Sequence, residues 1–151
     1  MKKIILSTLL LASFFLFTQC NSSKGTTSKA TTGVKFMKAD KLSTVLDRAE
    51  AEGKIVFIDF YATWCQPCKM MDKDVFTDKE IARFFNEKFV SYKVDAEKGT
   101  GPNIAAFYNV RAYPTLVWVD TKGNVLEETV GGTYHTELMK LAESALANSG
   151  Q

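Results

Sequence analysis

Residues 55–61 form the segment that most constrains the fold of this chain, because they read Ile-Val-Phe-Ile-Asp-Phe-Tyr and are apolar almost without a break. A strand with one face in water alternates apolar and polar residues, whereas a strand buried on both faces is apolar throughout. The segment is also rich in the β-branched and aromatic residues that strands prefer. It therefore predicts the central strand of a sheet that carries helices on both faces.

Segments with helical and with strand periodicity alternate along the rest of the chain. Gly53 ends the first helix, and residues 121–124 predict a turn that joins the last two strands into an antiparallel hairpin. The predicted helices cover residues 40–52, a stretch ending at about 73, 78–88, 102–109 and 136–147, and further strands cover 89–94, 115–119 and 125–130. This order predicts an α/β fold with a central mixed β-sheet flanked by helices on both faces.

The size of the chain allows one folded domain. With 151 residues, 46% of them hydrophobic, it can bury one core but is short for two domains. Its nineteen basic and seventeen acidic residues form no long run of one sign and sum to a net charge of +2, which does not favour nucleic-acid binding. We therefore expect one domain over residues 34–151, acting as a monomer.

The first twenty residues have the layout of an export signal. Lys2 and Lys3 precede an apolar stretch over 4–17, and Cys20 follows shortly after it. The stretch is shorter than the roughly 20 residues of a membrane-spanning helix. The arrangement resembles the bacterial lipoprotein signal, in which such a cysteine is lipidated and becomes the first mature residue. We expect a lipoprotein signal peptide over 1–19, and an ordinary cleaved signal or an uncleaved anchor are the alternatives.

The composition then changes to Ser, Thr, Lys and Gly up to Gly33, with almost no apolar side chain. Such a segment cannot offset the entropy lost on ordering. We expect a flexible tether over residues 20–33. Together with a lipid on Cys20, it would hold the domain on the periplasmic side of a bacterial membrane.

A Cys-x-x-Cys pair, Cys65 and Cys68, follows the central strand. Residues three apart on a helix lie on one face about 5 to 6 Å apart, which a disulfide can span. Unpaired N–H groups and a partial positive charge at a helix start lower the pKa of a cysteine there. Cys65 is thus predicted to be the attacking thiolate, and Cys68, one turn further in and better shielded, the resolving thiol. Pro67 fits the first helical turn, where a missing N–H costs no hydrogen bond.

Two alternative roles for the cysteine pair have less support. Half of a zinc site would need two more ligands, and only His135 and Cys20 could supply them. A purely structural disulfide would close a very short loop and add little stability. His135 lies alone at a predicted helix start, and we do not expect it to be catalytic.

Residues 57–69 resemble the active-site segment of the thioredoxin superfamily. Three further landmarks fall where that family has matching features: Val94-Asp95 after a strand, Tyr113-Pro114-Thr115 before a strand, and Gly131-Gly132 after the last strand. The resemblance covers about residues 35–147 and implies a thioredoxin fold. Residues 70–81 further resemble the periplasmic thioredoxin-like domain of the transmembrane thiol reductase.

Asp59 interrupts the apolar central strand, so its carboxyl group is expected to be buried and its pKa raised. The resemblance implies that this acid takes the proton of Cys68 during exchange. The alternative is a carboxylate held by backbone N–H groups near the end of the strand. Many thioredoxins keep a lysine near this acid; Ser91 stands at the corresponding position here, and Lys93 lies two residues on and points the same way.

The resemblance also implies a substrate-binding surface. Pro114 is expected to be cis and to pack beside the cysteines, while Tyr113 offers its backbone to an extended segment of the substrate. Tyr113 is bulkier than the residue usual at that position. Trp64 and Pro67 complete the predicted surface, and Tyr61 is expected in the core.

The sequence therefore predicts a thiol-disulfide oxidoreductase, a protein-disulfide reductase that uses its own cysteine pair and no cofactor or metal. The implied partners are exported proteins with disulfides and an upstream membrane thiol donor. Three alternatives stay open. A disulfide oxidase or isomerase is one, since the residues between the cysteines do not fix the potential. The others are a membrane-anchored copper carrier that uses both thiols and His135, and a docking module without chemistry.

Overall fold

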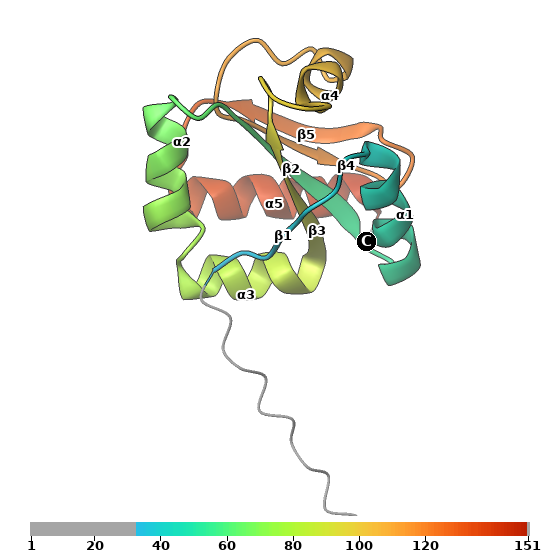
Figure 1. The fold of residues 1–151 in the computed structure, drawn as a ribbon. Coiled ribbons are helices and arrows are strands. Elements are labelled where there is room, and N and C mark those ends of the chain that lie inside the picture. The colour runs from blue at the N-terminus through green and yellow to red at the C-terminus, as the bar shows by residue number, and fades with distance from the viewer. Residues whose placement is uncertain (1–32, 151) are drawn as a thin grey trace, which may run out of the picture.

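The computed structural model describes residues 33–150, and a five-stranded sheet lies at its centre (Figure 1). The strands are β1 (Phe36–Met37), β2 (Ile55–Tyr61), β3 (Phe89–Asp95), β4 (Thr115–Val119) and β5 (Val125–Val130). The helices are α1 (Leu42–Glu52), α2 (Gln66–Met70), the π-helical segment η1 (Met71–Val75), α3 (Lys79–Lys88), α4 (Gly101–Phe107) and α5 (His135–Ser149).

The sheet is mixed, in the order β1-β3-β2-β4-β5. β2 occupies the middle, parallel to β3 and antiparallel to β4, and its first six residues are buried. β1 pairs in parallel with β3 at one edge, and β5 pairs antiparallel with β4 at the other. The prediction of a central strand that is buried on both faces is confirmed.

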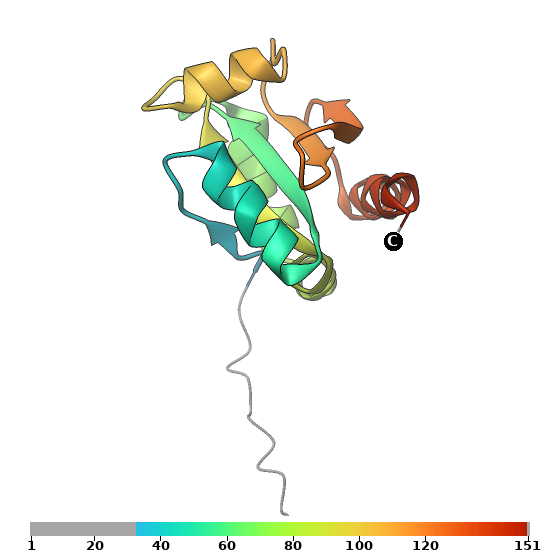
Figure 2. The same cartoon turned by 90° about the vertical axis from the view of Figure 1, so that its right-hand side faces the viewer.

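Two apolar layers cover the sheet, and β2 contributes to both because successive side chains of a strand point to opposite faces. Ile58 and Phe60 pack in the layer that contains Val45 of α1 and Ile104 of α4. Phe57, which faces the other way, packs in a second layer with side chains from η1, α3 and α5. Figure 2 shows α5 set against the β4–β5 end of the sheet. The predicted α/β architecture, with helices on both faces, is therefore confirmed.

The helix boundaries differ from the predicted ones for local reasons. The predicted helix over 78–88 begins at Lys79, because the carboxylate of Asp78 accepts hydrogen bonds from the N–H groups of Glu80 and Ile81 at 2.8 and 3.0 Å and so caps the helix. The predicted helix over 102–109 ends at Phe107, and Asn109 adopts a positive φ of 54°. The two-residue strand β1 was not predicted, since it is too short to carry a periodic pattern.

Gly33, the last residue of the predicted tether, is the first residue that the structure describes. Gly33 is buried, and its carbonyl oxygen accepts a hydrogen bond from the Asn86 side chain at 3.2 Å, so it belongs to the folded domain. The predicted signal peptide, the lipidated Cys20 and the rest of the tether lie outside the described residues. Within residues 33–150, none of the helices has the length and apolar character that a bilayer crossing requires.

Candidate active site

The cysteine pair lies where the central strand meets its helix. Cys65 is the N-cap residue of α2, with Pro67 in the first turn, and a disulfide joins it to Cys68 across a Cα–Cα distance of 5.4 Å. The backbone N–H of Cys68 donates a hydrogen bond to the Cys65 sulfur at 3.2 Å. That N–H group is one of the unpaired donors of a helix start, and it would stabilise a thiolate on Cys65 when the pair is reduced.

The expected difference in shielding between the two cysteines is absent from the structure. Cys65 and Cys68 are each 2% exposed. Both sulfurs belong to one small apolar cluster with Ala62, against which Tyr61 and Tyr113 pack. The two cysteines therefore differ in the N–H group aimed at Cys65 and not in burial.

Asp59 lies on β2 and is 1% exposed. Burial raises the pKa of its carboxyl group to about 6, although Lys93, with its Nζ atom 2.9 Å from Oδ2, opposes the rise. The other oxygen, Oδ1, has no hydrogen-bond partner among the described residues. The alternative in which backbone N–H groups hold this carboxylate is therefore wrong, and the raised pKa expected from the sequence is confirmed.

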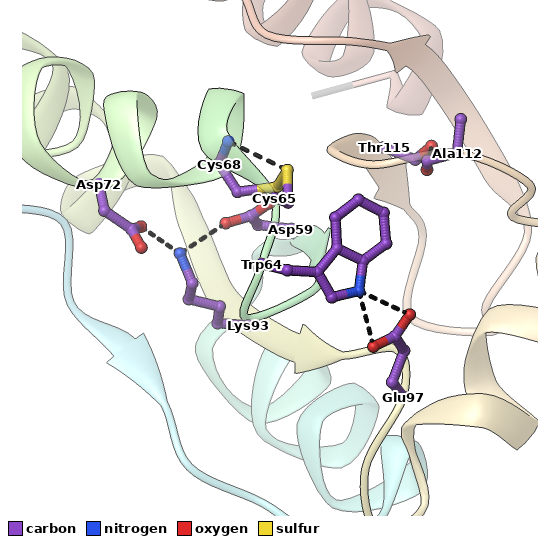
Figure 3. The surroundings of a disulfide bond; sticks show 9 residues. All are labelled: Asp59, Trp64, Cys65, Cys68, Asp72, Lys93, Glu97, Ala112 and Thr115. Atoms are coloured by element: carbon purple, nitrogen blue, oxygen red, sulfur yellow. Dashed lines mark hydrogen bonds and ion pairs between the residues drawn. A yellow bond between two sulfur atoms is a disulfide. The ribbon is translucent and has the colours of Figure 1, made fainter.

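Lys93 forms ion pairs with two carboxylates, and Figure 3 shows this charged group beside the disulfide. It pairs with Asp59 across neighbouring positions of β3 and β2, as the predicted orientation required, and it also contacts Asp72 of η1. Burial opposes its charge, but the two carboxylates outweigh burial and raise the pKa of Lys93 above its usual value. The ammonium group lies 4.8 Å from the ring centroid of Tyr61. Ser91 is also buried, and its hydroxyl has no partner within residues 33–150.

The predicted substrate-binding residues come together at the same end of the sheet. Trp64 is 66% exposed, as expected for a surface residue, and its ring lies edge-on to Tyr113 with the centroids 6.0 Å apart. The bond from Tyr113 to Pro114 is cis, as the resemblance implied. Tyr61 was expected in the core, but it is only partly buried because it ends β2 at the rim of the sheet.

The end of the hairpin packs against the helix that carries the cysteines. The N–H of Gly131 donates a hydrogen bond to the carbonyl oxygen of Pro114 at 2.8 Å. A side chain at Gly132 would meet Met70 and Pro67, since a Cβ atom there would lie 3.2 and 3.3 Å from their nearest atoms. The family landmarks seen in the sequence thus surround the disulfide.

His135 opens α5 and is not isolated. Its Nε2 atom lies 3.2 Å from a carboxylate oxygen of Glu80 and 3.6 Å from one of Asp78. In the part of the chain that the structure describes, no three His, Cys, Asp or Glu side chains are arranged to hold a metal ion. His135 therefore lies beside these two acidic residues and does not form a three-ligand group with the cysteines, the arrangement that related copper carriers usually have.

Two acidic residues of this region were not predicted from the sequence. Asp72 reaches Lys93 only because η1 continues the helix after the cysteines, and Glu97 accepts a hydrogen bond from the indole N–H of Trp64 from the turn after β3.

A cavity of about 360 Å³ lies away from the cysteine pair. It is lined by parts of β1, α1 and β3 together with Lys54 and Asn86, and none of the predicted site residues contributes to it.

Comparisons with known proteins agree on the kind of domain. A family model named Thioredox_DsbH, described as a protein of unknown function, DUF255, matches residues 21–141. A solution structure from Bacteroides thetaiotaomicron, provisionally described as a disulphide-isomerase, is 39% identical and superposes with a TM-score of 0.68 over 76% of this chain and 93% of that one. The fold is therefore the thioredoxin fold.

Two curated relatives match over shorter stretches. Thioredoxin-T of Drosophila melanogaster is 41% identical over 81 residues, which are 54% of this chain and 48% of that protein. The thiol:disulfide interchange protein DsbD of a Pseudomonas species is 31% identical over 83 residues, which are 54% of this chain but 14% of that protein. The matched stretch thus spans about half of one relative and a small part of the other.

Proposed function

Because the chain belongs to the Thioredox_DsbH family, we propose that it is a thiol-disulfide oxidoreductase whose reaction is carried by Cys65 and Cys68. The observation that carries the proposal is the placement of Cys65 at the start of α2, with the N–H of Cys68 aimed at its sulfur. This placement favours the thiolate, which is the nucleophile in disulfide exchange.

The exchange takes two steps in the reducing direction. The Cys65 thiolate attacks one sulfur of a substrate disulfide, forms a mixed disulfide and releases the other substrate sulfur as a thiolate. Cys68 then loses its proton and attacks the Cys65 sulfur, which releases the second substrate thiolate and closes the Cys65–Cys68 disulfide. Two electrons pass from the cysteine pair to the substrate, and its two sulfurs leave as thiols once protonated.

Asp59 is proposed to take the proton of Cys68 in the second step. A general base works best when its pKa lies near the operating pH. Burial raises the pKa of the Asp59 carboxyl group to about 6. Lys93 remains charged beside it and stabilises the carboxylate until the proton arrives. Trp64, Pro67, Tyr113 and Pro114 are proposed to bind the substrate segment around the disulfide.

The direction of electron flow is proposed to be reducing, with exported disulfide proteins as substrates and an upstream membrane thiol as donor. The resemblance of residues 70–81 to the periplasmic domain of the transmembrane thiol reductase supports this direction, and the likeness to a thioredoxin and to a stretch of DsbD supports thiol-disulfide exchange in general. The proposed place of action is the periplasmic side of a bacterial membrane, through a lipid on Cys20, and it rests on the signal-like first twenty residues. Disulfide isomerisation is a second candidate, favoured by the B. thetaiotaomicron relative.

The test combines turnover with trapping. Reduction of a protein disulfide substrate in the presence of a thiol reductant should be lost in Cys65→Ser. Cys68→Ala should accumulate a mixed disulfide through Cys65, which mass spectrometry can locate. Turnover that survives Cys65→Ser would disprove the proposal. Titration of the pair against a glutathione buffer separates the two candidates, since a strongly oxidising potential contradicts the reducing direction.

A further inference from the structure

Trp64 is an exposed side chain that is nevertheless held in place. It directly precedes Cys65, 66% of it is accessible to solvent, and an indole in that setting would ordinarily move among several rotamers. Its Nε1 atom lies 3.0 Å from each carboxylate oxygen of Glu97, which is 33 residues further along the chain. Tyr113 packs against its ring. In Figure 3 the indole lies beside the disulfide, and its nitrogen faces the Glu97 carboxylate.

Hydrogen bonds and an ion pair fix the turn that carries Glu97. Its N–H donates to the Asp95 carboxylate at 3.1 Å, and Lys98 forms an ion pair with the same carboxylate at 3.2 Å. The N–H of the intervening Ala96 donates to the carbonyl oxygen of Tyr61 at 2.9 Å. Tyr61 ends the strand that leads to the cysteines, so the turn that carries Glu97 is fixed to the same strand end as Cys65.

We propose that Glu97 is a positioning residue for disulfide exchange, which holds the Trp64 indole ready to receive the substrate segment beside Cys65. This inference rests on the proposed function. Hydrogen bonds to a charged acceptor are stronger than neutral ones, so one carboxylate suffices to restrict the ring. A ring that is already ordered loses less conformational entropy when the substrate docks, and this smaller entropy loss makes binding tighter. Glu97 does not touch the reacting sulfurs and acts only through Trp64.

The effect should fall on KM and leave kcat nearly unchanged. Loss of one such hydrogen bond in Glu97→Ala corresponds to a rise in KM of about fivefold for a protein disulfide substrate. Glu97→Gln keeps an acceptor without the charge and should restore most of the affinity. Glu50→Ala, which removes an exposed glutamate from α1, is the matched control and should leave KM unchanged.

Trp64→Phe keeps a ring but lacks the N–H group, so it is the variant in which the effect of Glu97→Ala can be tested without the hydrogen bond. In Trp64→Phe, the further change Glu97→Ala should have no effect on KM. The chain has two tryptophans, so the indole N–H signals of Trp64 and of the buried Trp118 can be followed separately by NMR. Glu97→Ala should shift the Trp64 signal and increase its fast motion, while the Trp118 signal stays in place.

The inference is overturned if KM is the same in Glu97→Ala and in the wild type, or if Glu97→Ala acts equally in the Trp64→Phe background. It is also overturned if the Trp64 signal and its motion do not change. These results would leave the proposed function intact, because Cys65-dependent turnover would continue. Absence of turnover in the wild type would instead remove the proposed function and this inference with it.

Discussion

Replacement of the buried carboxyl group by an amide, Asp59→Asn, should stabilise the oxidised protein in a pH-dependent manner. The pKa of Asp59 rises from 3.8 to about 6 on folding, chiefly through burial. A rise of about 2 units corresponds to ~3 kcal/mol of destabilisation once the group is ionised in both states. The side chain is 1% exposed, so solvent does little to screen this cost.

The direction of this pH dependence follows from the number of protons that the folded and unfolded states bind. Between pH 3.8 and about 6 the folded state holds the proton more tightly than the unfolded state, so wild-type stability falls as the pH rises through this window. The variant lacks the titrating group and escapes that loss. The difference in free energy of unfolding between Asp59→Asn and the wild type should therefore increase by about 2 kcal/mol between pH 4 and pH 8.

Urea unfolding with the disulfide intact measures this difference, and the fluorescence of the buried Trp118 reports it. With a typical urea m-value, the midpoint of Asp59→Asn should move upward relative to the wild type by roughly 1 to 2 M across the pH range. Asp47→Asn, which alters an exposed acid on α1, is the control and should show no such pH dependence. A difference that stays constant from pH 4 to pH 8 would refute the reasoning.

Three further variants test other contacts of the structure. Asp72→Asn removes a charge that raises the pKa of Asp59, so the Asp59 carboxyl should titrate at lower pH by carbon-13 NMR; an unchanged titration contradicts this role. Gly132→Val places atoms against Met70 and Pro67, so it should lower the free energy of unfolding in urea by about 1 to 3 kcal/mol and should also reduce turnover. Asp78→Ala removes the cap of α3 and should cost about 1 kcal/mol of stability in the same assay, with no loss of turnover.

Local patterns were sufficient to predict the central strand, the hairpin and the cysteine pair. β2 is apolar because both of its faces are covered, and the spacing of the cysteines matches one helical turn, so each pattern has a direct physical cause. The raised pKa of Asp59 also followed from one carboxylate placed in an apolar strand. These features depend on residues that are close together in the sequence.

The partners of Asp59 and Trp64 were harder to predict because tertiary contacts create them. Nothing near Asp72 in the sequence points to Lys93, and the two meet only through the packing of η1 beside β3. Glu97 likewise reaches Trp64 through the turn after β3. Equal burial of the two cysteines was missed since helix position alone does not show what covers each sulfur.

The most direct test of the central claim is the pKa of the Cys65 thiol in the reduced protein. The rate of alkylation by iodoacetamide, followed across pH with the modified residue identified by mass spectrometry, gives this value. We expect the thiol of Cys65 to titrate well below the usual value of about 8.5 and to react before Cys68. Titration of Cys65 at about 8.5, or faster alkylation of Cys68, would contradict the assignment of Cys65 as the attacking thiolate.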